Sequence, residues 1–152
     1  TGIVPPGFLG DPLLRVRFIA VAHRDHALHQ LDRALSYQDL RAHRQVVVRD
    51  SGARRRRDSG WLEAARRLTV SRIDFSVQAV CRGVGFAWLP EVVIQGPLNS
   101  GLLKPLPLNE GRERFAELFI VLPERELAGP AARRAEALIK NAAAALTCDR
   151  QR

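Results

Sequence analysis

The strongest constraint on the fold is the alternation of strand-like and helix-like segments along this chain of 152 residues. Short runs of apolar and β-branched residues are separated by stretches in which apolar residues recur at helical spacing. Such alternation is typical of an α/β sheet with mainly parallel strands, in which ligands bind beyond the carboxyl ends of the strands. The expected strands cover residues 13–22, 45–48, 68–71, 84–89, 102–108 and 117–122.

The expected helices are marked by the residues that begin or end them. Ser36-Tyr-Gln-Asp39 fits a capping box and predicts a short helix over residues 37–43. A helix over residues 74–82 should end at Gly83, because glycine adopts the left-handed conformation at little cost. We also expect an amphipathic helix over 61–68 and a final helix that begins at Gly129-Pro130. The buried stripe of that final helix should consist of Ala135, Leu138, Ile139, Ala142 and Leu146.

The first expected strand changes character along its length. Arg15 and Arg17 place charge on one of its faces, whereas Ile19 and Val21 make the same face apolar further along. This pattern indicates a strand that runs from an edge into a core.

Charge and cysteine content limit the classes of function. The formal net charge is +8 and most of the basic residues are arginine, so the chain should attract polyanions without this alone making it a nucleic-acid reader. Cys81 and Cys148 match no zinc or redox spacing, which favours a reduced, cytoplasmic protein. No apolar run approaches the ~20 residues of a membrane helix, and the N-terminus has no signal-peptide pattern. Because methionine is absent, we expect a fragment or a processed chain.

The stretch AHRDHALH, residues 22–29, raises the question of a metal or catalytic site. His23, His26 and His29 recur every third residue, but zinc would need a further ligand and a supporting partner. His43 is the only other histidine, and no downstream residue has convincing ligand spacing. We therefore interpret the stretch as a polar junction between a strand and a helix, and expect no metal.

Other chemical motifs are equally incomplete. Gly83-Val-Gly85 begins a dinucleotide-binding pattern, but Trp88 occupies the third glycine position and the glycines precede a strand. We interpret them as a helix stop and a tight turn. Ser51 and Ser59 each follow Arg-Asp without forming the nucleophile turn of hydrolases. We therefore expect neither enzymatic activity nor a cofactor.

Two features could hold an anion. The arginine run at residues 54–57 is either a solvated loop or the source of one side chain that pairs with an anionic ligand. Ser51-Gly52, Ser71 and Ser76 lie at expected strand ends or helix starts, where hydroxyls and free amides either bind a carboxylate or simply cap a helix.

Several segments together resemble the effector-binding domain of LysR-type transcriptional regulators. FLGDPLLRVRFIAVAHRDHAL resembles the family's strand that crosses between subdomains, and DLRAHRQVVVRDSG its next helix and strand. TVSRIDFSVQAVCRGVGFAWLP resembles the strand, helix and strand that follow. GLLKPLPL resembles the return crossing, and ELFIVLPER precedes the final helix. The order and spacing of these segments cover nearly the whole chain.

The resemblance implies an α/β, two-lobed fold like that of periplasmic binding proteins of type 2, with a small-molecule cleft between the lobes. Residues 1–21 and 102–152 would form a partial first lobe, and residues 22–101 a complete second lobe. The helix-turn-helix domain of the family and the opening strand and helix of its first lobe are absent from this sequence.

The resemblance also implies particular site residues. Ala22 and His23 would lie at one hinge between the lobes, and Lys104 near the other. By the same resemblance, the effector would contact Thr1, Gly2 and Ser71, and the loop over residues 50–60 would form the other wall of the cleft. From their position at one end of the expected sheet, we also expect contacts from the amides of Ser51 and Gly52 and from one arginine of the run, Arg54.

We expect, on these grounds, the sensing part of a bacterial, cytoplasmic regulator of transcription. Its effector would be a small metabolite, often a carboxylate in this family. The full-length protein would form a homodimer or tetramer and contact DNA only through the absent helix-turn-helix domain, and no membrane partner is expected. The alternatives are a stand-alone solute-binding module without a role at DNA, and direct nucleic-acid binding by the basic surface, which would depend steeply on salt.

Overall fold

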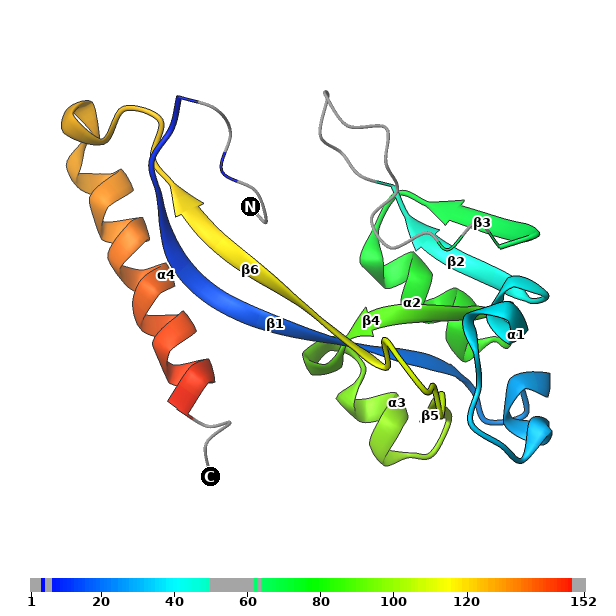
Figure 1. The fold of residues 1–152 in the computed structure, drawn as a ribbon. Helices are drawn as coiled ribbons and strands as arrows, with labels where there is room; N and C mark the ends of the chain where they lie inside the picture. Colours follow the sequence, from blue (N-terminus) through cyan, green and yellow to red (C-terminus); the bar gives the residue numbers. More distant parts are fainter. Residues whose placement is uncertain (1–3, 5–6, 50–61, 63, 149–152) are drawn as a thin grey trace. The chain divides into compact units, whose positions relative to one another are not determined.

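The computed structural model of the protein describes residues 4, 7–49, 62 and 64–148 (Figure 1). Its elements alternate between strands and helices, as the sequence predicts. In chain order they are β1 (Gly10–His23), the 3-10 helix η1 (Ala27–Leu31), α1 (Tyr37–Arg41), β2 (Arg44–Val48), β3 (Arg66–Val70), α2 (Ile73–Cys81), β4 (Phe86–Pro90), the 3-10 helix η2 (Glu91–Val93), α3 (Gln95–Asn99), β5 (Leu103–Pro105), β6 (Glu113–Val121), the 3-10 helix η3 (Arg125–Leu127) and α4 (Pro130–Cys148).

The strands form one mixed sheet in the order β3-β2-β4-β1-β5, and β6 also pairs with β1. β2 is parallel to both β3 and β4, whereas β1 is antiparallel to β4 and β5. The expectation of a mainly parallel sheet is therefore correct only for β2, β3 and β4. The long β1 runs in the opposite direction and brings its two neighbours into antiparallel pairing.

The chain packs as two compact units. Unit 1 consists of residues 1–16 and 115–152, and unit 2 consists of residues 17–114. Unit 2 is therefore continuous in sequence and interrupts unit 1. The lobe boundaries at 21/22 and 101/102 that the resemblance implies lie five and thirteen residues inside unit 2, and they stay a prediction.

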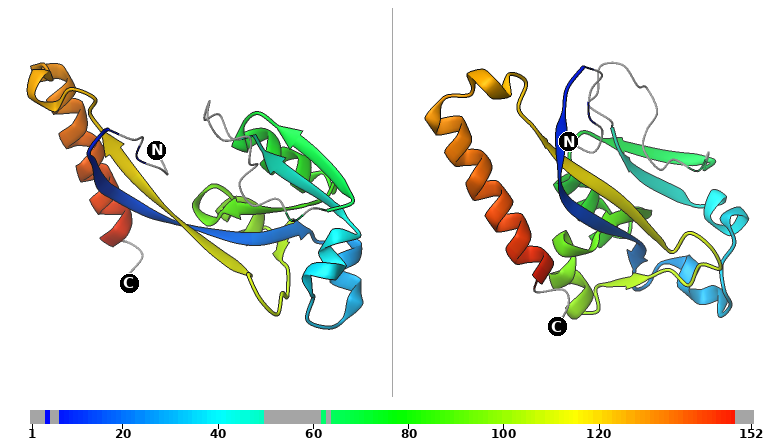
Figure 2. Two further views of the ribbon diagram at one scale, coloured as in Figure 1. Left: turned by 45° about the horizontal axis from the view of Figure 1, so that its top comes forward. Right: turned by 60° about the vertical axis from the view of Figure 1, so that its left-hand side comes forward.

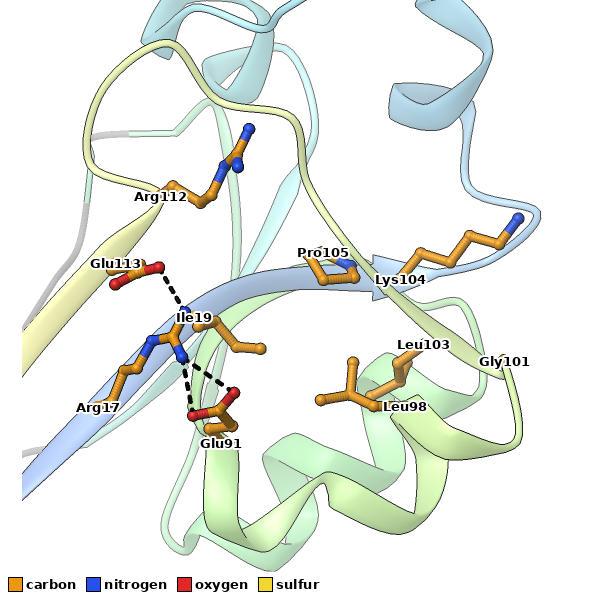
Figure 3. A pocket seen from close by; sticks show the side chains of 10 residues that line it. All are labelled: Arg17, Ile19, Glu91, Leu98, Gly101, Leu103, Lys104, Pro105, Arg112 and Glu113. Carbon is orange, nitrogen blue, oxygen red and sulfur yellow. Dashed lines mark hydrogen bonds and ion pairs between the residues drawn. The ribbon is translucent and has the colours of Figure 1, made fainter. Parts of the chain in front are cut away.

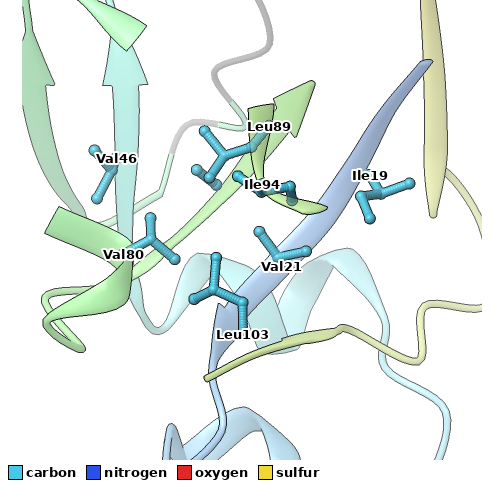
Figure 4. Packing of buried hydrophobic residues seen from close by; sticks show 8 residues of the cluster. Ile19, Val21, Val46, Val80, Leu89, Ile94 and Leu103 are labelled. Carbon is cyan, nitrogen blue, oxygen red and sulfur yellow. The ribbon is translucent and has the colours of Figure 1, made fainter. Parts of the chain in front are cut away.

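Unit 2 has an apolar layer on each face of its sheet, because side chains of a strand alternate between faces. From β1, Ile19 and Val21 enter one layer, and Ala20 and Ala22 enter the other. This explains why both faces of the first strand become apolar at that point in the sequence. The first layer, which includes α2, contains Ile19, Val21, Val46, Val80, Ala87, Leu89, Ile94 and Leu103 (Figure 4). The second layer, which includes η1 and α1, contains Ala20, Ala22, Leu28, Leu35, Leu40, Phe86, Leu106 and Leu108.

The helix ends in unit 2 follow their local sequence signals. Ser36 Oγ accepts a hydrogen bond from the Asp39 amide, and the Asp39 carboxylate accepts one from the Ser36 amide, so the predicted capping box of α1 is confirmed. α2 ends just before Gly83, whose φ of +72° is the left-handed conformation expected there. A Cβ on Gly85 would lie 2.2 Å from the Arg44 carbonyl oxygen, so the turn into β4 requires a glycine.

The expected helix over residues 61–68 is wrong. β3 occupies Arg66–Val70, and Leu62 and Ala64 lie in irregular structure before it. All five residues of β3 pair in register with β2, so main-chain pairing in the sheet prevails over the helical spacing of the apolar side chains. Trp61 and Glu63 lie outside the described residues.

In unit 1, an ion-pair cluster fixes how α4 is rotated about its axis. Asp11 in β1 binds the Arg125 guanidinium and lies 2.7 Å from Lys140 Nζ. Lys140 Nζ and Arg125 Nη2 lie 2.7 and 2.8 Å from the Glu136 carboxylate. The hydrogen bonds that Asp11 accepts from Arg125 and Lys140 lower its pKa to about 2.

The buried stripe predicted for α4 is consequently wrong. Ala143, on the same side as Glu136 and Lys140, is the buried residue of the described part of this helix, with 6% of its surface exposed. Ala135 and Ala142 are exposed, and Leu138, Ile139 and Leu146 are exposed to 61%, 46% and 51%. The predicted apolar residues do share one face of α4. That face is exposed, because the ion pairs of Glu136 and Lys140 direct the other face toward β1.

Two further views show β1 continuing from unit 1 into unit 2 as a single strand (Figure 2). Among the described residues, no helix is long and apolar enough to span a membrane.

Candidate functional site

The carboxyl ends of β2, β3 and β4 lie at one edge of the unit 2 sheet, because the three strands are parallel. Ser71 follows β3 at this edge, and Glu91 follows β4. β1 arrives from the opposite direction with Phe18 paired to Pro90, which brings Arg17 to the same edge. Ligands of open α/β sheets bind at such an edge, so we take it as the candidate site.

Arg17 connects three elements at this edge. Its Nη1 donates to the Glu91 carboxylate at 3.2 and 3.3 Å, and its Nη2 donates to Glu113 Oε1 at 2.5 Å. The hydrogen bond to Glu113, together with the charges of both carboxylates, raises the pKa of Arg17. Two acidic side chains therefore hold one half-buried guanidinium, and β1, η2 and β6 meet through it.

A cavity of about 540 Å³ opens beside this ion-pair group. Figure 3 shows Ile19 pointing into it, with Leu98 and Leu103 on the opposite side and the Arg17–Glu91 pair at its rim. All of the lining residues belong to unit 2. They are Arg17, Ile19, Glu91, Leu98, Gly101, Leu103, Lys104, Pro105, Arg112 and Glu113.

An apolar floor with a charged rim suits a small molecule that has an apolar part and an ionised group. Ile19 and Leu103 are buried and offer apolar contact, whereas Lys104 and Arg112 are exposed cations. Arg17, at the rim, is already paired with both glutamates of the lining. The lining therefore offers a ligand apolar contact together with two further positive charges.

The effector contacts implied by the resemblance are only partly visible. Ser71 is exposed and lies between β3 and α2, at the candidate edge. Thr1, Gly2, Ser51, Gly52 and Arg54 lie outside the described residues.

Ser76, a further candidate from the sequence, is only 1% exposed in α2. Its Oγ has no hydrogen-bond partner among the described atoms. The N-cap residue of α2 is Arg72, without a side-chain cap, so neither Ser71 nor Ser76 caps this helix.

The three expected hinge residues lie on two neighbouring strands. Ala22 is fully buried in β1 and pairs with Lys104 of β5, and His23 pairs with Leu103. The structure therefore brings Ala22, His23 and Lys104 together inside unit 2. Whether this pair of strands is a hinge stays a prediction.

The histidine-rich stretch joins β1 to η1, and two of its rings accept hydrogen bonds from main-chain amides. His23 Nδ1 accepts from the Asp25 amide at 3.3 Å, and His26 Nδ1 accepts from the Leu28 amide at 3.2 Å. Burial, followed by the neighbouring histidines, lowers the pKa of His26 to about 4. Within the described residues, no group of three or more acidic, cysteine or histidine side chains could hold a metal ion.

Sequence reasoning missed the ion-pair group around Arg17. Arg17 is separated from Glu91 and Glu113 by 74 and 96 residues, so nothing local marks the contact. The one hint in the sequence was that Arg17 lies on the same strand face as Ile19, where that face becomes apolar.

The sequence matches the family model described as "LysR substrate binding domain" over residues 2–144. No curated protein sequence matches it.

Among solved structures, the effector domain of Pseudomonas aeruginosa AmpR superposes with a TM-score of 0.71 at 16% identity, covering 98% of this chain and 72% of that one. The regulatory domain of Synechocystis CcmR, solved with 2-PG, gives 0.67 at 14% identity, covering 94% and 71%. Full-length LysG from Corynebacterium glutamicum, solved with bound effector Arg, gives 0.64 at 20% identity, covering 94% of this chain and 48% of LysG. The chain thus spans about half the length of the full-length regulators it matches.

Proposed function

This chain belongs to the LysR substrate-binding domain family, and from that premise we propose that it senses a small-molecule effector for a regulator of transcription. The observation that carries the proposal is the family match itself, which spans residues 2–144 and includes both compact units. The structures of LysG with Arg and CcmR with 2-PG support an effector-binding role for this fold.

We propose further that the effector is a small carboxylate bound at the carboxyl edge of β2, β3 and β4. Ser71 would donate its hydroxyl, and the amides of Ser51 and Gly52 and the guanidinium of Arg54 would complete the set. The half-buried Arg17 group lies at the same edge, which supports this location. The cavity beside Arg17 extends along β1 and β5, and Ser71 does not line it. Binding between the two lobes, as the resemblance implies, would bias the domain toward a closed form.

Thermal unfolding of the whole chain tests the proposal with defined probes: L-arginine, 2-PG, and a panel of aliphatic and aromatic carboxylates. A ligand that binds only the folded state stabilises it by about 2.7 kcal/mol at one hundred times its Kd. We expect at least one probe to raise Tm in proportion to the logarithm of its concentration. A chain whose Tm responds to none of them contradicts the proposal.

Trp88 provides a second, local readout. Its Nε1 donates to the Gly111 carbonyl at 2.9 Å, and the Arg114 guanidinium lies 3.8 Å from its ring centre. Replacing Trp61, the only other tryptophan, with phenylalanine makes Trp88 the sole tryptophan emitter in unit 2. We expect its emission to change with the same probe that raises Tm.

Two serine variants test the assignment of the contact residue. We expect Ser71→Ala to reduce the ligand-induced rise in Tm, and Ser100→Ala to leave it unchanged because Ser100 Oγ binds only the Pro97 carbonyl at the end of α3. An undiminished rise in Ser71→Ala shows that Ser71 does not contact the effector.

The alternative is a stand-alone solute-binding module of the same fold. The two differ in the coding sequence upstream of Thr1, where an in-frame helix-turn-helix supports the regulator. Turnover of a probe would instead indicate an enzyme.

A further inference from the structure

Four arginines lie near the amino ends of β2 and β3, at the edge opposite the candidate effector site. Arg44 begins β2 and Arg66 begins β3. Arg41 ends α1, and Arg82 follows α2. All four are exposed, and all four belong to unit 2. We call this group the arginine edge.

Arg44 and Arg66 are in-register neighbours on two parallel strands. Adjacent strands lie about 4.8 Å apart and paired residues point to the same face, so the two positive charges project side by side. Like charges placed this way on a sheet are destabilising unless an anion lies between them.

Local contacts hold the other two arginines in the same region. The Arg41 carbonyl accepts a hydrogen bond from the Ala65 amide at 3.0 Å, next to Arg66. The close approach of Gly85 to the Arg44 carbonyl ties the turn after Arg82 to the start of β2. The four arginines therefore come from separate segments whose main chains meet at one edge of the sheet.

Within the described residues, no carboxylate pairs with any member of the arginine edge. In the part of the chain that the structure describes, Arg41 Nε donates to a neutral partner, the Leu62 carbonyl, at 3.2 Å. Other arginines of this unit are neutralised: Arg17 by Glu91, Arg33 by Asp39 and Arg72 by Asp74. Among the described side chains, the arginine edge thus carries positive charge that no carboxylate compensates.

We propose that the arginine edge binds the sugar–phosphate backbone of duplex DNA without reading its sequence. Arginine presents a planar fork of donors that matches phosphate oxygens. A protein partner would need apolar anchors, but none of the exposed large hydrophobic residues lies within 41–44, 64–66 or 82–85.

This inference goes beyond effector sensing, because it gives the sensing domain its own contact with DNA in addition to the expected helix-turn-helix. The contact lies at the amino edge of the parallel strands and the proposed effector at their carboxyl edge, so one domain of this kind can hold both. Backbone contacts of this type set position and affinity without carrying sequence information.

The test measures binding of the 152-residue chain to a fluorescently labelled duplex of arbitrary sequence, by anisotropy over a range of salt concentrations. Each phosphate contact contributes about −0.9 to the slope of log affinity against log salt. We expect the double variant Arg44→Gln/Arg66→Gln to flatten that slope by about 2 and to weaken binding at least ~10-fold at low salt.

The matched control is Arg15→Gln/Arg134→Gln, which removes the same two charges from exposed positions in unit 1. We expect it to leave the slope unchanged, and Arg44→Lys/Arg66→Lys to retain most of it. Arginines 54–57 are present in every variant, so the differences report only the substituted positions. Circular dichroism of each variant verifies that the fold is retained.

Three results would overturn the proposal. The first is a control variant that flattens the slope as much as Arg44→Gln/Arg66→Gln, which would indicate diffuse charge. The second is poly-glutamate displacing the duplex at equal charge concentration, which would indicate any polyanion. The third is saturation of the arginine edge by millimolar inorganic phosphate with loss of duplex binding, which would indicate a small-phosphate site. None of these results depends on effector binding. The DNA-binding proposal can therefore be contradicted while the effector proposal stands, and the reverse.

Discussion

His26 differs from an ordinary surface histidine because its ring is partly buried among other histidines. The rings of His26 and His43 lie 5.2 Å apart, and the Nδ1 of His26 accepts the Leu28 amide. Both features favour the neutral ring of His26. A protonated Nδ1 could no longer accept the Leu28 amide, and the charged ring would be repelled by any neighbouring histidine that is also protonated. Its pKa of about 4 is the consequence, with burial as the largest cause.

We predict from this pKa that stability falls as the solution is acidified. A histidine that titrates near 6.5 when unfolded and near 4 when folded binds its proton first in the unfolded chain. Its stabilising contribution is complete above pH ~6.5 and is lost progressively as the pH falls toward ~4. Allowing for solvent screening, the loss between pH 7.5 and pH 5 should be about 1 kcal/mol in urea unfolding.

His26→Asn is the matched variant for this prediction, because an asparagine at a cap position still accepts the Leu28 amide but does not titrate. The variant should lose less stability than the parent over the same pH interval. Parallel pH profiles would contradict the assignment, as would an NMR titration placing His26 near 6.5.

At the scale of elements, α1 depends on its cap more than a long helix would. It has only five residues, and it places Leu40, which is fully buried, in the second apolar layer. Arg33 binds both carboxylate oxygens of Asp39, at 2.7 and 2.9 Å. These bonds lower the pKa of Asp39 and keep it ionised for its part in the capping box.

We predict that Ser36→Ala destabilises the chain by about 1 kcal/mol, the usual cost of removing an N-cap hydroxyl. Ser71→Ala is the control, since Ser71 is exposed and caps no helix, and it should change stability by less than about 0.5 kcal/mol. Urea unfolding measures both. Equal losses in the two variants would mean that the cap does not support α1.

The elements that sequence alone could place are those with short-range signals. The capping box at Ser36, the left-handed Gly83 and Pro130 at the start of α4 each act within a few residues, and the structure confirms all three. The strand at residues 66–70 and the rotation of α4 could not be predicted, because each depends on a partner that is distant in sequence. β2 recruits residues 66–70 into the sheet, and Asp11 holds Lys140 toward β1.

The same distinction applies to the candidate site. Ser71 could be assigned to a strand end from the sequence, because a strand and the beginning of a helix flank it directly. The Arg17 group could not, because a contact over 74 residues leaves no periodicity. The family resemblance supplied the two-lobed architecture, which the alternation of elements alone does not specify.

At the scale of the whole molecule, the apolar core is unevenly distributed. Among the buried hydrophobic residues of the described chain, only Val16 and Ala143 belong to unit 1. Unit 1 also carries the most exposed large hydrophobic residues, Leu9 at 87% and Leu127 at 79%. Unit 2 therefore has two apolar layers to stabilise it, whereas unit 1 relies largely on β-pairing and ion pairs.

We predict that the two units differ in hydrogen exchange. Amides of β4 and of β1 from Ile19 onward should exchange only through global unfolding, because they lie between the two apolar layers. Amides of α4 should exchange at least ~10-fold faster through local opening, since its apolar stripe contacts no core. Mass spectrometry of peptides from both units measures this, and uniform protection would contradict it.

The interruption of unit 1 by unit 2 has a consequence for how the chain is made. Residues 17–114 are synthesised before most of β6 and before all of α4. Since domains generally fold as they emerge from the ribosome, unit 2 can fold on the nascent chain. Residues 1–16 cannot yet pack at that stage, because the rest of unit 1 follows unit 2 in the sequence. Unit 1 can close only after residues 115–152 have been synthesised.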